Sequence, residues 1–141
     1  MNDETRCCCC GGTASSSTRG DGELPSGKVE DGEPVAAAAA REALEETGWE
    51  GTDLRHLVIL EASPGFSDPR HHVDWTTACD TSALPSTRTS RTTSEWISPE
   101  RVPSLIAGGH IKAAHTIAAL LTLRELRTAA ALAASSQPPA S

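Results

Sequence analysis

Three glutamates that stand close together in the chain, Glu42, Glu45 and Glu46, are the residues best suited to chemistry. In a helix that turns 100° per residue, their carboxylates fall within an arc of about 100°, and such close like charges repel each other. A hard divalent cation such as Mg²⁺ reverses the sign of this interaction, because carboxylate and water oxygens are its preferred ligands. An acidic stretch with no further context is more often a solvated helix end.

A helix must position these glutamates, and the flanking residues predict one. Pro34 suits the first turn of a helix, and Gly48 suits a left-handed cap at its end. The residues between them are dominated by strong helix formers and include no breaker, so we expect a helix from about 34 to 47. The side opposite the glutamates carries small residues at helical spacing, which we expect to pack against a sheet: Ala36, Ala39 and Ala43.

The acidic cluster is the end of a longer motif, GKVEDGEPVAAAAAREALEETG, at residues 27–48. Besides the glutamates already named, its fixed positions include Gly27, Glu33 and Arg41. The motif resembles the signature of the Nudix hydrolases, which split nucleoside diphosphates linked to another group. Coincidence of all the fixed residue types has odds on the order of one in 10⁸ to 10⁹, so chance does not explain the match.

This resemblance implies a metal site. Glu42, Glu45 and Glu46 would hold Mg²⁺, with Mn²⁺ as a substitute, and the backbone carbonyl of Ser26 would contribute another ligand. Ser26 lies in a loop over residues 23–33, which its glycines and proline predict.

The resemblance also implies the catalytic residues Glu33, Arg41, Glu45 and Glu46. Glu33 and Arg41 would form a salt bridge that ties the loop to the helix and orients the glutamates. An ordinary exposed pair of this kind contributes less than about 1 kcal/mol, so we expect Arg41 to act through positioning. Which glutamate would be the general base stays open.

A second loop makes the chain similar to one branch of the Nudix family. Residues 63–68 read SPGFSD between two predicted strands, which looks like the ADP-ribose pyrophosphatase-like branch. We expect Gly27, Phe66, Ser67 and Asp68 at the substrate, with Phe66 as the candidate for stacking. Pro69 stands where relatives often have glutamate, and residues 81–94 contain no carboxylate, although relatives often have an acidic residue there.

The resemblance implies an α+β fold, a Nudix-type α/β/α sandwich with a mixed sheet. We expect strands at 54–61, 72–79 and 95–97 and a short helix at 101–107. A long helix from 111 to about 134 should cover the sheet face opposite the catalytic helix. The domain would span 23–134, followed by an unstructured tail at 135–141.

The segment before the motif is the exception. Residues 6–21 show neither alternation nor a hydrophobic run, so we expect no strand there and a disordered or aberrant segment over 1–22. The sheet would then lack its N-terminal strands, as a frameshift in the coding sequence would explain. Cys7 to Cys10 are adjacent, a spacing that does not suit zinc, although a metal or redox module and lipidation stay open.

Composition limits the partners. The net charge of −7 and the pI near 5.1 argue against nucleic acid, because no basic face could displace counterions. No apolar run reaches the length of a membrane span and no signal peptide is recognised, so we expect a cytoplasmic protein, with a homodimer allowed. His71 and His72 follow the second loop and could touch substrate phosphates, although paired histidines there are more often surface residues.

These patterns predict a Mg²⁺-dependent Nudix hydrolase that cleaves the pyrophosphate of ADP-ribose or a related nucleoside diphosphate derivative. The alternative is a catalytically impaired remnant that binds nucleotide or a protein partner without turnover. The missing strands, Pro69 and the stretch over 81–94 without acids motivate it.

Overall fold

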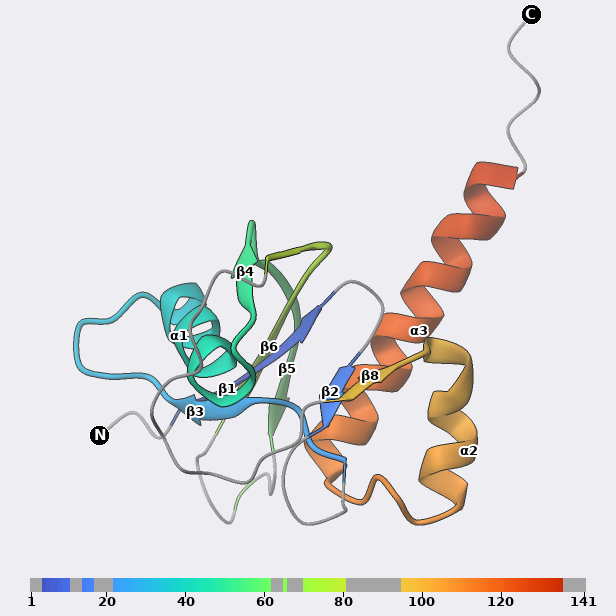
Figure 1. Cartoon of the computed structure of the whole chain (residues 1–141), viewed down its shortest axis with the longest axis horizontal. Coiled ribbons are helices and arrows are strands. Elements are labelled where there is room, and N and C mark those ends of the chain that lie inside the picture. The colour runs from blue at the N-terminus through green and yellow to red at the C-terminus, as the bar shows by residue number, and fades with distance from the viewer. Residues whose placement is uncertain are drawn as a thin grey trace, which may run out of the picture.

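The computed structural model describes residues 4–10, 14–16, 22–61, 65, 70–80 and 95–135. A four-stranded sheet separates helix α1 (Val35–Thr47) from the long helix α3 (Ala114–Ser135) (Figure 1). The expected α+β class, an α/β/α sandwich around a mixed sheet, is therefore confirmed.

The main sheet is mixed because its strands run in both directions. It consists of β3 (Ser26–Lys28), β1 (Glu4–Cys10), β6 (Arg70–Thr76) and β5 (Arg55–Glu61), in that spatial order. β1 is parallel to β6, with Cys7 opposite Val73, and antiparallel to β3, with Cys7 opposite Ser26. β5 is antiparallel to β6 and forms one edge.

Two short strand pairs flank this sheet. β2 (Ala14–Ser16) pairs with β8 (Glu95–Ile97), and β4 (Glu50–Thr52) pairs with β7 (Ala78–Asp80). The strands predicted at 54–61 and 95–97 are confirmed. The single strand predicted at 72–79 was wrong in extent, because the chain changes partner at Thr77: β6 pairs with β5, whereas β7 pairs with β4.

The expectation that residues 6–21 contain no strand was also wrong, because β1 and β2 lie there. β1 pairs with two neighbours, β3 and β6, that are remote from it in sequence. A strand with sheet on both sides and helices over both faces does not need alternating polarity, and cysteine behaves as a small apolar residue. In the sequence, the cysteine run over 7–10 ends at two glycines, and its length and C-terminal boundary fit a short strand.

Helix α1 agrees with its prediction to within a residue. Pro34 precedes it with extended backbone (φ −60°, ψ 140°), and Gly48 caps it at φ 76° with its N–H bonded to the carbonyl of Leu44 at 2.9 Å. Ala39 and Ala43 are buried against Leu54, as predicted. Ala36 is exposed and Ala38 is buried in its place. Helical spacing predicts a direction around the axis, whereas the turns that meet the sheet depend on where the helix lies over it.

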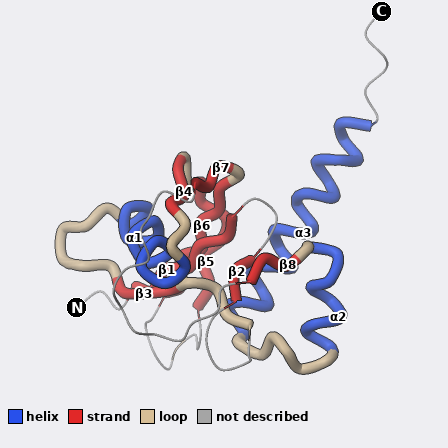
Figure 2. Tube along the Cα trace, viewed as in Figure 1, coloured by secondary structure: helices blue, strands red, loops and turns tan. Residues whose placement is uncertain are grey.

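The main hydrophobic core lies between the sheet and the C-terminal helices. The 3₁₀ turn η1 (Pro99–Arg101), α2 (Val102–Ala107) and α3 agree with the predicted helices, and the second half of α3 extends away from the body of the fold (Figure 2). α3 covers the sheet face opposite α1, as predicted. The buried side chains of this core are Leu24, Val73, Ile97, Val102, Ile111, Ala119, Leu120 and Leu123.

The predicted loop over 23–33 contains one short strand, β3, which pairs with β1. Ser135 is the last residue of α3, and the rest of the predicted tail lies outside the described residues. The domain limits of 23 and 134 stay predictions. In the described part of the chain, no helix combines the length and the apolar character needed to span a membrane.

Candidate active site

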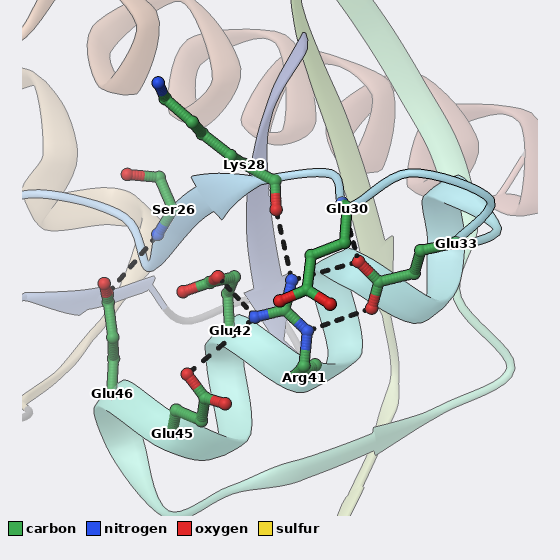
Figure 3. Close-up of polar contacts among 8 residues, drawn as sticks. All are labelled: Ser26, Lys28, Glu30, Glu33, Arg41, Glu42, Glu45 and Glu46. Atoms are coloured by element: carbon green, nitrogen blue, oxygen red, sulfur yellow. Dashed lines mark hydrogen bonds and ion pairs between the residues drawn. The ribbon is translucent and has the colours of Figure 1, made fainter. Parts of the chain in front are cut away.

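Residues 26–33 pass over the C-terminal half of α1, and the candidate active site lies at this crossing. Figure 3 shows the side chains of Glu42, Glu45 and Glu46 projecting from the last turns of α1 toward β3. The helical spacing in the sequence therefore does place three carboxylates on one side of the helix, as predicted, with Ser26 opposite them.

Arg41 joins the loop to the helix through the predicted salt bridge with Glu33. Its Nε lies 2.9 Å from Glu33 Oε1 and its Nη2 lies 3.0 Å from Glu33 Oε2, so the contact is two-pronged. Nη2 also donates a hydrogen bond to the carbonyl of Lys28 at 3.1 Å. The hydrogen bond from Arg41, followed by one from the backbone of Glu30, lowers the pKa of Glu33. These contacts fix residues 28–33 against α1.

The same guanidinium also holds the glutamate cluster. Arg41 Nη1 lies 2.6 Å from Glu42 Oε1 and 3.8 Å from Glu45 Oε2. Its hydrogen bonds with Glu33 and Glu42 raise the pKa of Arg41, so it stays charged. Gly27 faces Glu42 closely, since a Cβ built on Gly27 would overlap the Glu42 carboxyl group. Only glycine therefore leaves room for this carboxylate between the loop and Arg41.

Glu46 lies in an environment that disfavours its charged form. Its Oε2 accepts a hydrogen bond from the N–H of Ser26 at 3.3 Å. Burial raises the pKa of Glu46 to about 7, the Ser26 N–H opposes this shift, and the negative charges of Glu42, Glu23 and Glu45 add to it. In the metal-free protein, Glu46 is therefore only partly ionised near neutral pH.

The chemistry of this donor set fits a hard divalent cation. The negative charges of Glu42 and Glu45 help to raise the pKa of Glu46, and a cation bound among these carboxylates would offset that repulsion. Within the described ranges, no three His, Cys, Asp or Glu residues are already arranged around a metal position. Arg41 instead supplies the positive charge beside Glu42, while Glu45 is 39% exposed and in looser contact.

The structure thus brings together most of the residues predicted from the sequence. Those gathered at the crossing are Ser26, Gly27, Glu33, Arg41, Glu42, Glu45 and Glu46. Phe66, Ser67 and Asp68, predicted to bind substrate, lie outside the described residues, as do Pro69 and residues 81–94. The side chains of Cys7 to Cys10 are likewise not described, although their backbone forms part of β1.

Two contributors were not predicted. The Lys28 carbonyl accepts a bond from Arg41, and no property of the lysine side chain signals this role. Glu23 adds negative charge near Glu46 although it stands well before α1 in the sequence. An acidic residue just upstream of the motif was the available signal for Glu23, but its distance from Glu46 depends on the path of the loop.

Comparisons with known proteins agree with this arrangement. A family model described as NUDIX domain matches residues 4–120. The chain is 33% identical over 101 residues to a CMP-5'-(N-acetyl-N-hydroxy-3-aminopropyl)phosphonate hydrolase of Streptomyces rubellomurinus (strain ATCC 31215), which covers 72% of this chain and 49% of that protein. It is 43% identical over 51 residues to an ADP-ribose pyrophosphatase of Bacillus subtilis (strain 168), which covers 36% of this chain and 28% of that protein.

The chain therefore spans half or less of the length of these curated relatives. Among solved structures, that of an ADP compounds hydrolase superposes with a TM-score of 0.75 at 18% identity, covering 89% of this chain and 73% of that one. This likeness shows the fold. The similarity to the ADP-ribose pyrophosphatase-like branch, predicted from the sequence, is confirmed. Since the family model covers most of the chain, from β1 through the glutamate motif into α3, this protein belongs to the NUDIX family.

Proposed function

We propose that this protein is a Mg²⁺-dependent hydrolase that cleaves the pyrophosphate of ADP-ribose or a related nucleoside diphosphate derivative. The observation that carries the proposal is the gathering of Glu42, Glu45 and Glu46 beside Ser26 at the end of α1. The names of its relatives refer to ADP-ribose and to a CMP-linked phosphonate, which supports a nucleotide joined to a second group as the substrate class.

Each residue at the crossing has a role in this proposal. Glu42, Glu45 and Glu46, with the Ser26 carbonyl, would hold Mg²⁺, for which Mn²⁺ would substitute. When bound, the cation neutralises diphosphate charge and acidifies water. Arg41 and Glu33 hold the loop and the glutamates in register through their two-pronged contact. Glu45 and Glu46 are the candidates for the general base that takes a proton from the attacking water.

Metal removal tests the proposal directly. The purified full chain is incubated with ADP-ribose and Mg²⁺, and the release of AMP is followed by anion-exchange chromatography. We expect AMP release to stop when a chelator is in excess and to return when Mg²⁺ or Mn²⁺ is added back. A parallel panel of CMP-linked and other nucleoside diphosphate derivatives would identify the preferred substrate. AMP release that is unaffected by the chelator would contradict the metal dependence.

Arg41→Lys should separate charge from geometry. Lysine keeps the positive charge but cannot make the two-pronged contact with Glu33 while it also reaches Glu42. We expect a loss of about 10- to 100-fold in Mg²⁺ affinity or in activity, the range seen when groups that orient metal ligands are changed. The readout is the Mg²⁺ concentration that gives half-maximal rate, and Arg127→Lys, at an exposed position of α3, is the matched control. Equal activation curves for both variants would refute the positioning role.

The alternative, binding without turnover, is favoured by one observation: Arg41 is already paired with Glu42. Calorimetric binding of ADP-ribose with no AMP release over long incubation would support this alternative. A homodimer, a cytoplasmic location and the absence of a nucleic-acid partner stay predictions.

A further inference from the structure

A pocket of about 240 Å³ lies between the end of β5, the start of β6 and the first turns of α3, away from the glutamates of α1. Its lining combines apolar and titratable side chains: Leu60, Glu61, His71, Ala114, His115 and Ala118. Pockets for whole drug-sized ligands usually exceed about 300 Å³. The size therefore suits one ring system rather than a complete nucleoside diphosphate.

Two histidines form one wall of this pocket. The rings of His71 and His115 are stacked, with centroids 4.9 Å apart and planes inclined by 3°. His71 Nδ1 is buried and makes no hydrogen bond to the described residues. Buried polar atoms in proteins are almost always satisfied, so a ligand or water that bonds this nitrogen would be favoured here.

The rim supplies an acceptor for a hydrogen-bond donor on the ligand. Glu61 lines the pocket with a side chain that is 52% exposed, and its Oε1 lies 3.7 Å from Arg70 Nε. Leu60, Ala114 and Ala118 add apolar surface. Burial first, and then the neighbouring His71, lower the pKa of His115, which favours the neutral form of this ring. A neutral planar ring with an amino group matches this combination.

One short segment connects the pocket to the glutamate cluster. The N–H of Leu24 donates to Thr116 Oγ1 at 3.4 Å, beside His115 in α3. Two residues later, the N–H of Ser26 donates to Glu46 at 3.3 Å. Since an extended chain advances about 3.3–3.6 Å per residue, these two contacts are separated by roughly 7 Å along the backbone. Residues 24–26 therefore contact both the first turns of α3 and the glutamate cluster.

We propose that this pocket binds the nucleobase of the substrate, with the base stacked on the His71–His115 pair and its amino group bonded to Glu61. The class of ligand is a base with an exocyclic amino group, such as adenine or cytosine. The inference rests on the proposed function for the identity of the substrate, but the pocket itself can be tested without metal or hydrolysis.

The experiment follows the imidazole resonances of His71 and His115 by NMR in the metal-free full chain. Adenosine, cytidine and uridine are titrated separately, so that no phosphate contributes to binding. We expect adenosine or cytidine to shift both resonances, and uridine, which has a carbonyl in place of the amino group, to bind at least about tenfold more weakly. Glu61→Gln should reduce this discrimination, because the carboxylate acceptor is lost.

Filling the pocket provides the matched variant. Ala118→Phe places a ring in the pocket and should abolish the nucleoside-dependent shifts, whereas Ala129→Phe, at an exposed position of the same helix, should keep them. His71→Phe tests the buried nitrogen while a ring is retained, which covers the case in which Ala118→Phe does not fold. Unchanged shifts in folded Ala118→Phe, or no response to any nucleoside in the wild-type chain, would overturn the inference.

The hydrolysis assay separates this inference from the proposed function. Nucleoside-dependent shifts without AMP release would support the nucleobase pocket and contradict the proposed hydrolase activity. AMP release without any histidine response, and with the same KM in Ala118→Phe as in the wild type, would support the hydrolase activity and contradict the nucleobase pocket.

Discussion

Glu46→Gln should remove Mg²⁺-dependent hydrolysis while it stabilises the metal-free protein. Glutamine keeps the shape of the side chain and its acceptor for the Ser26 N–H, but it lacks the negative charge that would bind a cation. We expect kcat/KM for ADP-ribose to fall by about 10²–10³-fold, the range found when one group that stabilises transition-state charge is lost. The measurement is the initial rate of AMP release at saturating Mg²⁺.

The stability of the same variant has a defined pH dependence. The pKa of Glu46 is about 7 in the folded protein, compared with 4.5 for an unperturbed glutamate. The folded state therefore binds this proton more tightly than the unfolded state does. Its contribution to stability is therefore present below about pH 4.5 and is lost as the pH rises through about 7. Without metal, we expect the Tm of Glu46→Gln to match that of the wild type near pH 5 and to exceed it at pH 8, as measured by circular dichroism.

Addition of Mg²⁺ should reverse this order. A ligand that binds only the native state raises Tm, so Mg²⁺ should stabilise the wild type at pH 8 and have little effect on Glu46→Gln. Glu125→Gln, at an exposed position of α3, makes the same chemical change outside the site and should show neither effect. Wild-type activity in Glu46→Gln, or the same Mg²⁺-dependent rise in Tm for both proteins, would contradict the assignment of Glu46.

Gly27→Ala should be the second most damaging change to activity, although the fold should tolerate it. The added methyl group would overlap the Glu42 carboxyl group, which must then move away from its position between Gly27 and Arg41. The overlap is with the end of a flexible side chain, so rotation of Glu42 can relieve it with little change in Tm. We expect a loss of about 10- to 100-fold in kcat/KM, because a metal ligand loses its orientation.

A double-mutant cycle identifies the route of this effect. If Gly27→Ala acts by displacing Glu42, it should cause little further loss in a Glu42→Gln background. Gly32→Ala is the control for a methyl group added elsewhere in the same loop: Gly32 has φ 78° and no atom within 4 Å of its Cβ position, so alanine there does not contact Glu42. Additive losses in the double variant, or an equal loss of activity in Gly32→Ala, would refute the steric argument.

Local sequence predicted the elements that depend on local interactions. Pro34 and Gly48 set the ends of α1 within a residue, because proline fixes its own φ and glycine accepts the positive φ of 76° at the C-terminal cap without strain. The spacing of Glu42, Glu45 and Glu46 fixed their common side of the helix, since backbone geometry alone decides it. The Glu33–Arg41 pair was predicted from the motif, and the structure adds that its contact is two-pronged.

Tertiary structure decided what depends on distant partners. The sequence showed no strand over 6–21, yet β1 forms because β3 and β6 supply hydrogen bonds on both its edges. The change of partner at Thr77 and the burial of Ala38 in place of Ala36 follow from where the elements pack, which residue types do not encode. The same holds for Glu46, whose pKa rises because the fold buries it and brings Glu23 near, and for the stacking of His71 on His115, residues from different elements. The chain alone thus determined the motif and its helix, whereas pairing, burial and the field of remote charges required the folded protein.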